Sequence, residues 1–496
     1  MERDRENTAR GAGPSGRRAG PGSGRTDRRP GHGRGSRSTS GRLRGHGSGA
    51  AARRRLSLVL AALLLAALAL TGCTGTHRDT GGPGPGPGPT GPSNTDPALG
   101  WGFTHTQYSA DTGDDDAVAR ARELLSGRGL PQDQAIMGWG AGNPEPSPGS
   151  YDFSDLDRRI SYIRSTGATP VITLCCAPDW MKGGKAGASG TDWSVKSLET
   201  APLPAHYKDF AALAATVAAR YPDVRHFVVW NEFKGFFDDT RRRWNYEGYT
   251  QLYNQVYDAL KQADQANLVG GPYLAMDSYG PQDQSYASSL KGPWGSVDQR
   301  VLDAFTYWNK HKRGADFVVV DGASFTRTNQ LLPDAFAATD KLTAVSDWVR
   351  EQSGLPLWWA EYYVEPDASG WSEQRRVATQ AAGLAALARG GTGTAFYWSP
   401  ERQSGPCPGC LWSPTQHADG GRQLPMYALI AAFAAAFPPG TRFTTVSVAP
   451  DDVPNVRVLA SDKAVLVVNT LDRAIDAKVD GRSFSMAAYE VRWLTR

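Results

Sequence analysis

The feature that most constrains the fold is an alternation that begins near residue 99. Short apolar runs are followed by longer stretches whose apolar residues recur at helical spacing. Strands that alternate with helices build βα units, and βα units build a parallel sheet. The apolar runs predict eight strands, at residues 100–106, 135–140, 170–176, 226–232, 267–273, 316–322, 356–363 and 393–399.

Amphipathic stretches between these runs predict helices. Residues 155–167 carry Leu156, Ile160 and Ile163 on one helical face and end on Gly167, a common helix stop. Eight strands with helices between them, over about 300 residues, are typical of an α/β fold of the (β/α)8 TIM barrel class. The barrel is expected over residues 99–440. The other predicted helices are 207–221, 249–264, 342–354, 375–391 and 424–440.

The pattern changes after residue 440. Apolar and polar residues now alternate in the runs "TTVSVAP", "NVRVLAS", "AVLVVNT", "AIDAKVD" and "AYEVRWL". Alternation with period two is typical of strands that bury one face. Residues 441–496 are therefore predicted to form a small C-terminal antiparallel, β-sandwich-like domain.

The first 55 residues differ from the rest in charge. They hold 15 Arg, no Lys and four acidic residues, a net charge of +11, so residues 56–496 carry −7 of the total of +4. This Arg, Gly and Ser-rich arm has too few apolar residues to fold and is predicted to be disordered. It reads either as a nucleic-acid-binding tail or as a long basic region before an export signal.

An apolar run favours the export signal. Residues 56–73 read "LSLVLAALLLAALAL" and then "TGC", which is typical of a signal peptide and too short for a comfortable membrane span. The ending resembles the bacterial lipobox, which makes Cys73 the lipidated residue; an uncleaved anchor is the alternative. A Pro/Gly-rich linker follows at residues 74–98. The folded part is thus expected outside the cytoplasm, attached to the membrane, and an arm before the signal would not bring it to nucleic acid.

Four further cysteines are present. In an oxidising compartment, Cys407 and Cys410 are predicted to form a short disulfide, since two thiols fall short of the four ligands of a structural zinc site. Cys175 and Cys176 are adjacent, and two buried thiols on opposite sides of a strand are favoured over a vicinal disulfide. No metal site and no cofactor are predicted, because the eight His show no close ligand spacing.

Two glutamates lie at the ends of predicted strands. Glu232 closes the fourth strand, directly after Asn231, and Glu361 lies near the end of the seventh. Active residues of such barrels lie at the carboxyl ends of the strands, so both should meet at the barrel mouth. A pair of carboxyl groups at one mouth suits glycoside hydrolysis. Glu365 competes with Glu361, which is preferred because it directly follows an apolar run.

Aromatic residues complete the candidate site. Among the 15 Trp, Trp180 and Trp398 are predicted to touch ligand, because sugars pack on aromatic rings and both follow strand ends. Tyr273 ends the fifth strand. Tyr363 follows Glu361, and either it or its neighbour Tyr362 is expected to point into the pocket.

Here the sequence resembles a known family. The Trp-Asn-Glu at 230–232 and the Glu of the seventh strand are similar to those of clan A retaining glycoside hydrolases. The segments 149–174, 203–221 and 268–274 resemble glycoside hydrolase family 39, the β-xylosidase and α-L-iduronidase group. The resemblance implies Glu232 as general acid/base, Glu361 as nucleophile, and Asn231 as a partner of the sugar 2-hydroxyl.

Two departures limit the resemblance. The sixth strand end carries Asp321 and Phe325 where such enzymes often carry His and Tyr, and the second lacks the expected Arg or His. The sequence thus predicts a retaining glycosidase acting on an extracellular or envelope polysaccharide, with no obligate protein partner evident. The alternatives are an endo-acting enzyme of another clan A family and an inactive polysaccharide-binding lipoprotein.

Overall fold

The structure is a computed structural model that describes residues 96–496. The Arg-rich arm, the signal segment with Cys73 and the linker up to residue 95 lie outside the described residues. Among residues 96–496, no helix combines the length and the apolar character that a membrane crossing requires.

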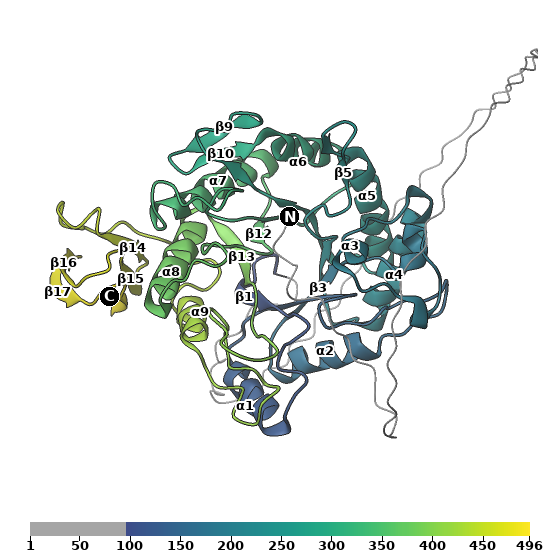
Figure 1. The fold of residues 1–496 in the computed structure, drawn as a ribbon, viewed down its shortest axis with the longest axis horizontal. Helices are drawn as coiled ribbons and strands as arrows, with labels where there is room; N and C mark the ends of the chain where they lie inside the picture. The colour runs from purple at the N-terminus through teal and green to yellow at the C-terminus, as the bar shows by residue number, and fades with distance from the viewer. Residues whose placement is uncertain (1–95) are drawn as a thin grey trace, which may run out of the picture. The chain divides into compact units, whose positions relative to one another are not determined.

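Eight parallel strands close into a barrel with helices around it (Figure 1). The predicted (β/α)8 TIM barrel is confirmed. Around the barrel the order is β1-β13-β12-β11-β7-β4-β3-β2. The strands are β1 Gly100–Thr104, β2 Gln132–Ala135, β3 Pro170–Leu174, β4 His226–Val229, β7 Leu268–Ala275, β11 Phe317–Asp321, β12 Leu357–Trp359 and β13 Thr392–Tyr397.

The longer helices lie between these strands, with apolar faces directed at the sheet. They are α1 Asp115–Leu125, α2 Ser154–Ser165, α4 Tyr207–Arg220, α5 Tyr246–Ala263, α6 Gln299–His311, α7 Asp340–Ser353, α8 Glu373–Arg389 and α9 Pro425–Ala436. Shorter elements lie in the loops: α3 Val195–Leu198, β5 Phe237–Asp238, β6 Arg243–Trp244, β8 Ser278–Tyr279, β9 Ala287–Gly292 and β10 Gly295–Asp298.

The second strand was predicted too late in the chain. The run 135–140 is mostly loop, and β2 is the polar sequence Gln132–Ala135, all of it buried. Its polar side chains are satisfied inside the fold: Gln132 bonds to His105 and Gln134 to Arg159. A hydrophobic pattern cannot detect a strand whose buried groups are polar and paired.

The barrel interior is filled by one compact apolar cluster. Trp358 lies at its centre, stacked on Phe317 with ring centroids 3.9 Å apart. Because this cluster fills the barrel interior, polar side chains gather outside it, at the carboxyl ends of the strands.

The C-terminal segment forms the predicted antiparallel domain, with two corrections. Its sheets are β14-β15-β18 and β16-β17, and β14, β15, β16 and β18 match predicted runs. The run "TTVSVAP" makes only an isolated bridge, through Val448, with another at Phe443 just before it, and an extra strand, β17, was missed. Contacts with α8 attach the domain to the barrel. Its strands are β14 Val456–Ala460, β15 Ala464–Asn469, β16 Ile475–Val479, β17 Arg482–Met486 and β18 Val491–Thr495.

The cysteine pairing differs from expectation at one place. Cys175 and Cys176 form a vicinal disulfide, against the favoured interpretation as separate thiols. The physical reason is that β3 ends at Leu174, so the two residues follow the strand and do not alternate across it. Cys407 and Cys410 are also joined as a disulfide.

Candidate functional site

The fourth barrel strand delivers Asn231 and Glu232 through a tight turn. The Lys234 N–H donates to the Asn231 carbonyl at 3.0 Å, and the Trp230 indole N–H donates to the Lys234 carbonyl at 2.8 Å. Trp230, Glu232 and Phe233 adopt positive φ values of 69°, 47° and 55°. Such backbone conformations are costly for residues other than glycine and gather at functional sites.

Aromatic packing holds this turn in place. Phe233 is fully buried and stacks on Tyr249 of α5, with ring centroids 3.9 Å apart. Trp230 is also fully buried and packs edge-on against Phe210 of α4. The Glu232 carboxyl group therefore projects from a rigid base, and its side chain remains 21% exposed.

The seventh barrel strand delivers Glu361. The Ala360 N–H donates to the Val320 carbonyl of β11 at 2.9 Å, which keeps the chain in sheet register just before the glutamate. The Glu361 residue is 7% exposed. Its carboxylate accepts hydrogen bonds from the hydroxyl of Tyr273, at 2.7 Å, and from that of Tyr363. Both tyrosines predicted for the site thus contact the proposed nucleophile.

Tyr273 reaches Glu361 because β7 is irregular at this point. The pairing of β7 with β11 steps from Pro272 to Leu274, so Tyr273 is the extra residue of a β-bulge with φ 56°. A bulge bends a strand and redirects one side chain, which is a common device beside active sites.

Three carboxyl groups converge at the mouth. Oxygen atoms of Glu232, Asp321 and Glu361 all lie within 4.8 Å of one another. Lys234 faces them, with its Nζ 2.7 Å from Glu232 Oε2 and 3.5 Å from Glu199 Oε1. Asp321 was noted in the sequence only as a departure, and Lys234 was not singled out, although it lies two residues beyond Glu232.

Burial and mutual repulsion set the protonation of this cluster. Burial, and then the charge of Glu232, raise the pKa of Glu361 to about 8, while Lys234 and the two tyrosine hydroxyls oppose the rise. Burial, and then Glu232, raise the pKa of Asp321 well above its usual range. Since a buried cluster cannot hold three negative charges beside one ammonium group, it retains at least one proton near neutral pH.

Two hollows adjoin the carboxyl groups. A small cavity of about 20 Å³ is lined by Glu361, Asn231, Tyr273 and Trp398, among others. A cleft of about 1120 Å³ opens outside it and is lined by Tyr363, Glu365, Trp398 and Arg402, among others. Trp139 and Trp398 line both hollows and meet edge-on, with centroids 6.5 Å apart. Since the small cavity has room for about one water molecule, any larger ligand must displace side chains such as these two.

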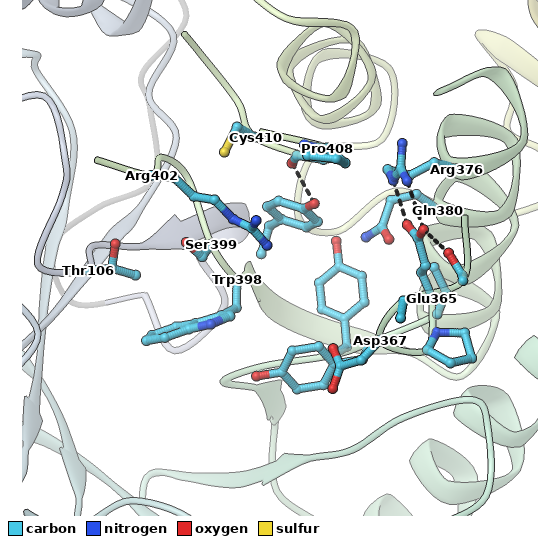
Figure 2. A pocket seen from close by; sticks show the side chains of 18 of the residues that line it. Thr106, Glu365, Asp367, Arg376, Gln380, Trp398, Ser399, Arg402, Pro408 and Cys410 are labelled. Carbon is cyan, nitrogen blue, oxygen red and sulfur yellow. Dashed lines mark hydrogen bonds and ion pairs between the residues drawn. The ribbon is translucent and has the colours of Figure 1, made fainter. Parts of the chain in front are cut away.

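The cleft separates Glu365 from the carboxyl cluster. In Figure 2 the Arg376 guanidinium faces Glu365 on one side of the cleft, and Trp398 lies on the other. Arg376 donates two hydrogen bonds to Glu365, at 2.5 and 2.8 Å. A carboxylate held in this bidentate pair with Arg376 has a structural role. The geometry therefore favours Glu361 over Glu365 as a reacting group.

Trp180 is not brought to the site. It is absent from the described residues that line the cleft or the small cavity. Its indole N–H donates to the Glu145 carbonyl at 2.8 Å, and its ring meets His206 edge-on. Trp139, near the start of the loop after β2, takes the place on the cleft that the sequence had suggested for Trp180.

Two further buried groups line the small cavity. Asp133 of β2 accepts hydrogen bonds from the Thr173 hydroxyl at 3.0 Å, and burial raises its pKa to about 7. His105 bonds to Ser109 and Gln132, and burial together with Arg159 lowers its pKa to about 3, so it is neutral. Neither residue stood out in the sequence: Asp133 lies in β2, which was predicted too late in the chain, and His105 ends the predicted first strand without a recognisable motif.

The chain is similar to known proteins in part of its sequence and in its fold. No protein-family model matches the chain. A β-xylosidase of Caldicellulosiruptor saccharolyticus is 30% identical over 151 residues, a stretch that covers 28% of this chain and only 28% of that protein. This similarity is in line with the resemblance to clan A glycoside hydrolases of the family 39 type.

Solved structures are similar in fold. SrfJ of Salmonella typhimurium matches 80% of this chain and 90% of its own, with 13% identity and a TM-score of 0.53. A monomeric β-xylosidase of Caulobacter crescentus CB15 matches 75% of each chain, with 18% identity and a TM-score of 0.49. At 13% identity, the likeness to SrfJ shows the barrel fold.

Proposed function

We propose that this chain is a retaining glycoside hydrolase of clan A, most like family 39, in which Glu361 is the nucleophile and Glu232 the general acid/base. One observation carries the proposal: the two carboxyl groups come from the ends of β4 and β12 and have oxygen atoms within 4.8 Å of each other. A retaining mechanism needs a separation of roughly 5 Å, whereas an inverting one needs a wider gap that admits a water molecule.

The surrounding groups suit this assignment. The Tyr273 and Tyr363 hydroxyls donate to Glu361, which favours its ionised form, as attack on the anomeric carbon requires. Asn231 lies beside Glu361 in the lining of the small cavity, within the region where a sugar 2-hydroxyl would bind. Trp139 and Trp398 offer ring faces and edges to the sugar, and the cleft outside has space for a leaving group of several sugar units.

A panel of aryl glycosides and oligosaccharides tests the reaction. Wild type should release product with the anomeric configuration of the substrate, as followed by proton NMR. The Glu232→Ala variant with azide should give a glycosyl azide of retained configuration, and Glu361→Ala one of inverted configuration. Glu365→Gln is the matched control, since it removes a carboxylate of the same cleft that is paired with Arg376.

The outcomes separate the alternatives. Inverted product from the wild-type protein would contradict the mechanism. If no glycoside is turned over and no 2-fluoro glycoside traps a covalent intermediate, the inactive polysaccharide-binding lipoprotein becomes the better interpretation. Cleavage inside long oligosaccharides but not of aryl monosaccharides would favour the endo-acting enzyme.

The location is also a proposal. An extracytoplasmic, lipid-anchored protein is supported by the apolar run before Cys73 and by the two disulfides of the described part. A Cys73→Ala variant should leave the membrane fraction for the soluble fraction. Equal retention of variant and wild type in washed membranes would argue against a lipid anchor.

A further inference from the structure

Asp321 is the third carboxyl group of the cluster. It is the last residue of β11, is 1% exposed, and its Oδ1 atom has no hydrogen-bond partner among residues 96–496. Its carboxyl group lies within 4.8 Å of oxygens from both proposed reacting glutamates. A carboxyl group so deeply buried is costly unless it carries a proton or is paired.

The neighbours of Asp321 come from three other strand ends. Glu232 follows β4, and Glu361 and Tyr363 follow β12; Lys234 contacts Glu232 at 2.7 Å. From β7 comes Tyr273, followed by Asp277, whose Oδ2 lies 3.7 Å from Arg327 Nε. Burial raises the pKa of both tyrosines well above the usual value, so each stays a neutral donor.

These contacts decide which carboxyl groups are ionised. Glu361 receives two hydroxyl donors, which stabilise its charged form. Lys234 contacts Glu232 and lowers the pKa of Glu361, while burial and Glu232 raise the pKa of Asp321 well above its usual range. Once Glu361 has ionised, near its pKa of about 8, the proton that the cluster still retains resides between Asp321 and Glu232.

We propose that Asp321 is a positioning residue that holds the catalytic proton jointly with Glu232. The inference rests on the proposed function and adds a residue to it. In the form of the enzyme that reacts, the pair carries one proton and Glu361 is ionised, so the three carboxyl groups carry two negative charges and Lys234 offsets one.

The charge of the cluster then stays constant through the reaction. In the first step the bond from the anomeric carbon to the leaving oxygen breaks, the bond to a Glu361 oxygen forms, and the proton of the pair passes from Glu232 to the leaving oxygen. Glu361 loses its charge as an ester while the pair gains one. In the second step water attacks the anomeric carbon, its proton returns to the pair, and Glu361 leaves as a carboxylate.

Such a pair has a physical advantage for an acid/base that must work in both directions. Lys234 alone would favour the ionised form of Glu232 and leave it without a proton to donate. A second carboxyl group beside it raises the affinity of the pair for its proton, because two like charges at this distance repel. Asp321 thus offsets the effect of Lys234 on Glu232, and the pair still holds its proton at the pH at which Glu361 is ionised.

An infrared titration of the protonated-carboxyl band of the whole protein tests the pair without substrate. In wild type, one band should persist above pH 8, after the band of Glu361 has titrated. In Asp321→Asn it should titrate about one pH unit lower or more, since the like charge is gone. Asp133→Asn is the control: it should remove a separate band that titrates near pH 7 and leave the upper one in place.

The pH dependence of kcat/KM gives the second readout. In Asp321→Asn the alkaline limb of the kcat/KM profile should shift to lower pH by the same number of pH units as the infrared band, and activity should recover toward acid pH. A variant that is only structurally damaged should instead lose activity at every pH. If the infrared band or the alkaline limb stays at its wild-type pH in Asp321→Asn, the proposal is overturned. It is also overturned if all carboxyl bands of the wild-type protein vanish below pH 6, a result that does not require the variant to fold.

The two proposals fail separately. A protein that turns over glycosides but shows the same titration in wild type and Asp321→Asn keeps its function and loses the proton pair. A protein that shows the shifted titration but cleaves no glycoside keeps the pair and loses the proposed function.

Discussion

Replacement of Asp133 by Asn should make the stability of the barrel less dependent on pH. Asp133 is 4% exposed, and burial raises its pKa from 3.8 to about 7 in the folded protein. A raised pKa means that the folded state favours the neutral acid. Its contribution to stability is therefore complete below pH 3.8 and is lost as the pH rises toward 7.

The size of the effect follows from the pKa shift. A shift of about three units corresponds to about 4 kcal/mol, at about 1.4 kcal/mol for each unit. The free energy of unfolding of Asp133→Asn, relative to wild type, should rise by about 4 kcal/mol between pH 4 and pH 7 and then level off. Urea unfolding followed by Trp fluorescence at several pH values measures this difference.

Thr173→Val is a control in which the free energy of unfolding, relative to wild type, should change with pH in the opposite direction. The Thr173 hydroxyl donates to both Asp133 oxygens at 3.0 Å and so favours the ionised carboxylate. Without it, the variant should lose stability relative to wild type as the pH rises. A flat difference for Asp133→Asn across this interval would refute the assignment of Asp133 as a buried carboxyl group that must ionise at neutral pH.

Further predictions concern the site. Tyr273→Phe should lower kcat by about tenfold or more in steady-state assays, because Glu361 loses a donor at 2.7 Å. The acid limb of kcat/KM should lie near pH 8, far above the usual range of glutamate, since activity rises as Glu361 ionises; a limb near pH 4.5 would contradict this. Glu365→Gln should cost about 2 kcal/mol in urea unfolding, because Arg376, only 11% exposed, loses its carboxylate. Trp398→Ala should raise KM by about tenfold, and an unchanged KM would place the sugar elsewhere.

Local pattern was sufficient for most of the barrel and for two of its glutamates. Apolar runs mark where a strand is buried on both faces, and their ends mark the barrel mouth, so Glu232 and Glu361 could be placed on one rim without coordinates. The same reasoning failed at β2, where Gln132 and Gln134 are buried through hydrogen bonds to His105 and Arg159. A signal based on hydrophobicity does not report that kind of burial.

The sequence by itself determined seven of the eight barrel strands, the C-terminal β domain and the strand ends that carry Asn231, Glu232 and Glu361. Only the tertiary structure decided what surrounds them. Asp321 meets Glu232 because β11 and β4 end at the same mouth, and Tyr273 reaches Glu361 because a bulge turns it inward. Periodicity records which face of an element is buried, whereas contacts between residues tens of positions apart exist only once the barrel has closed.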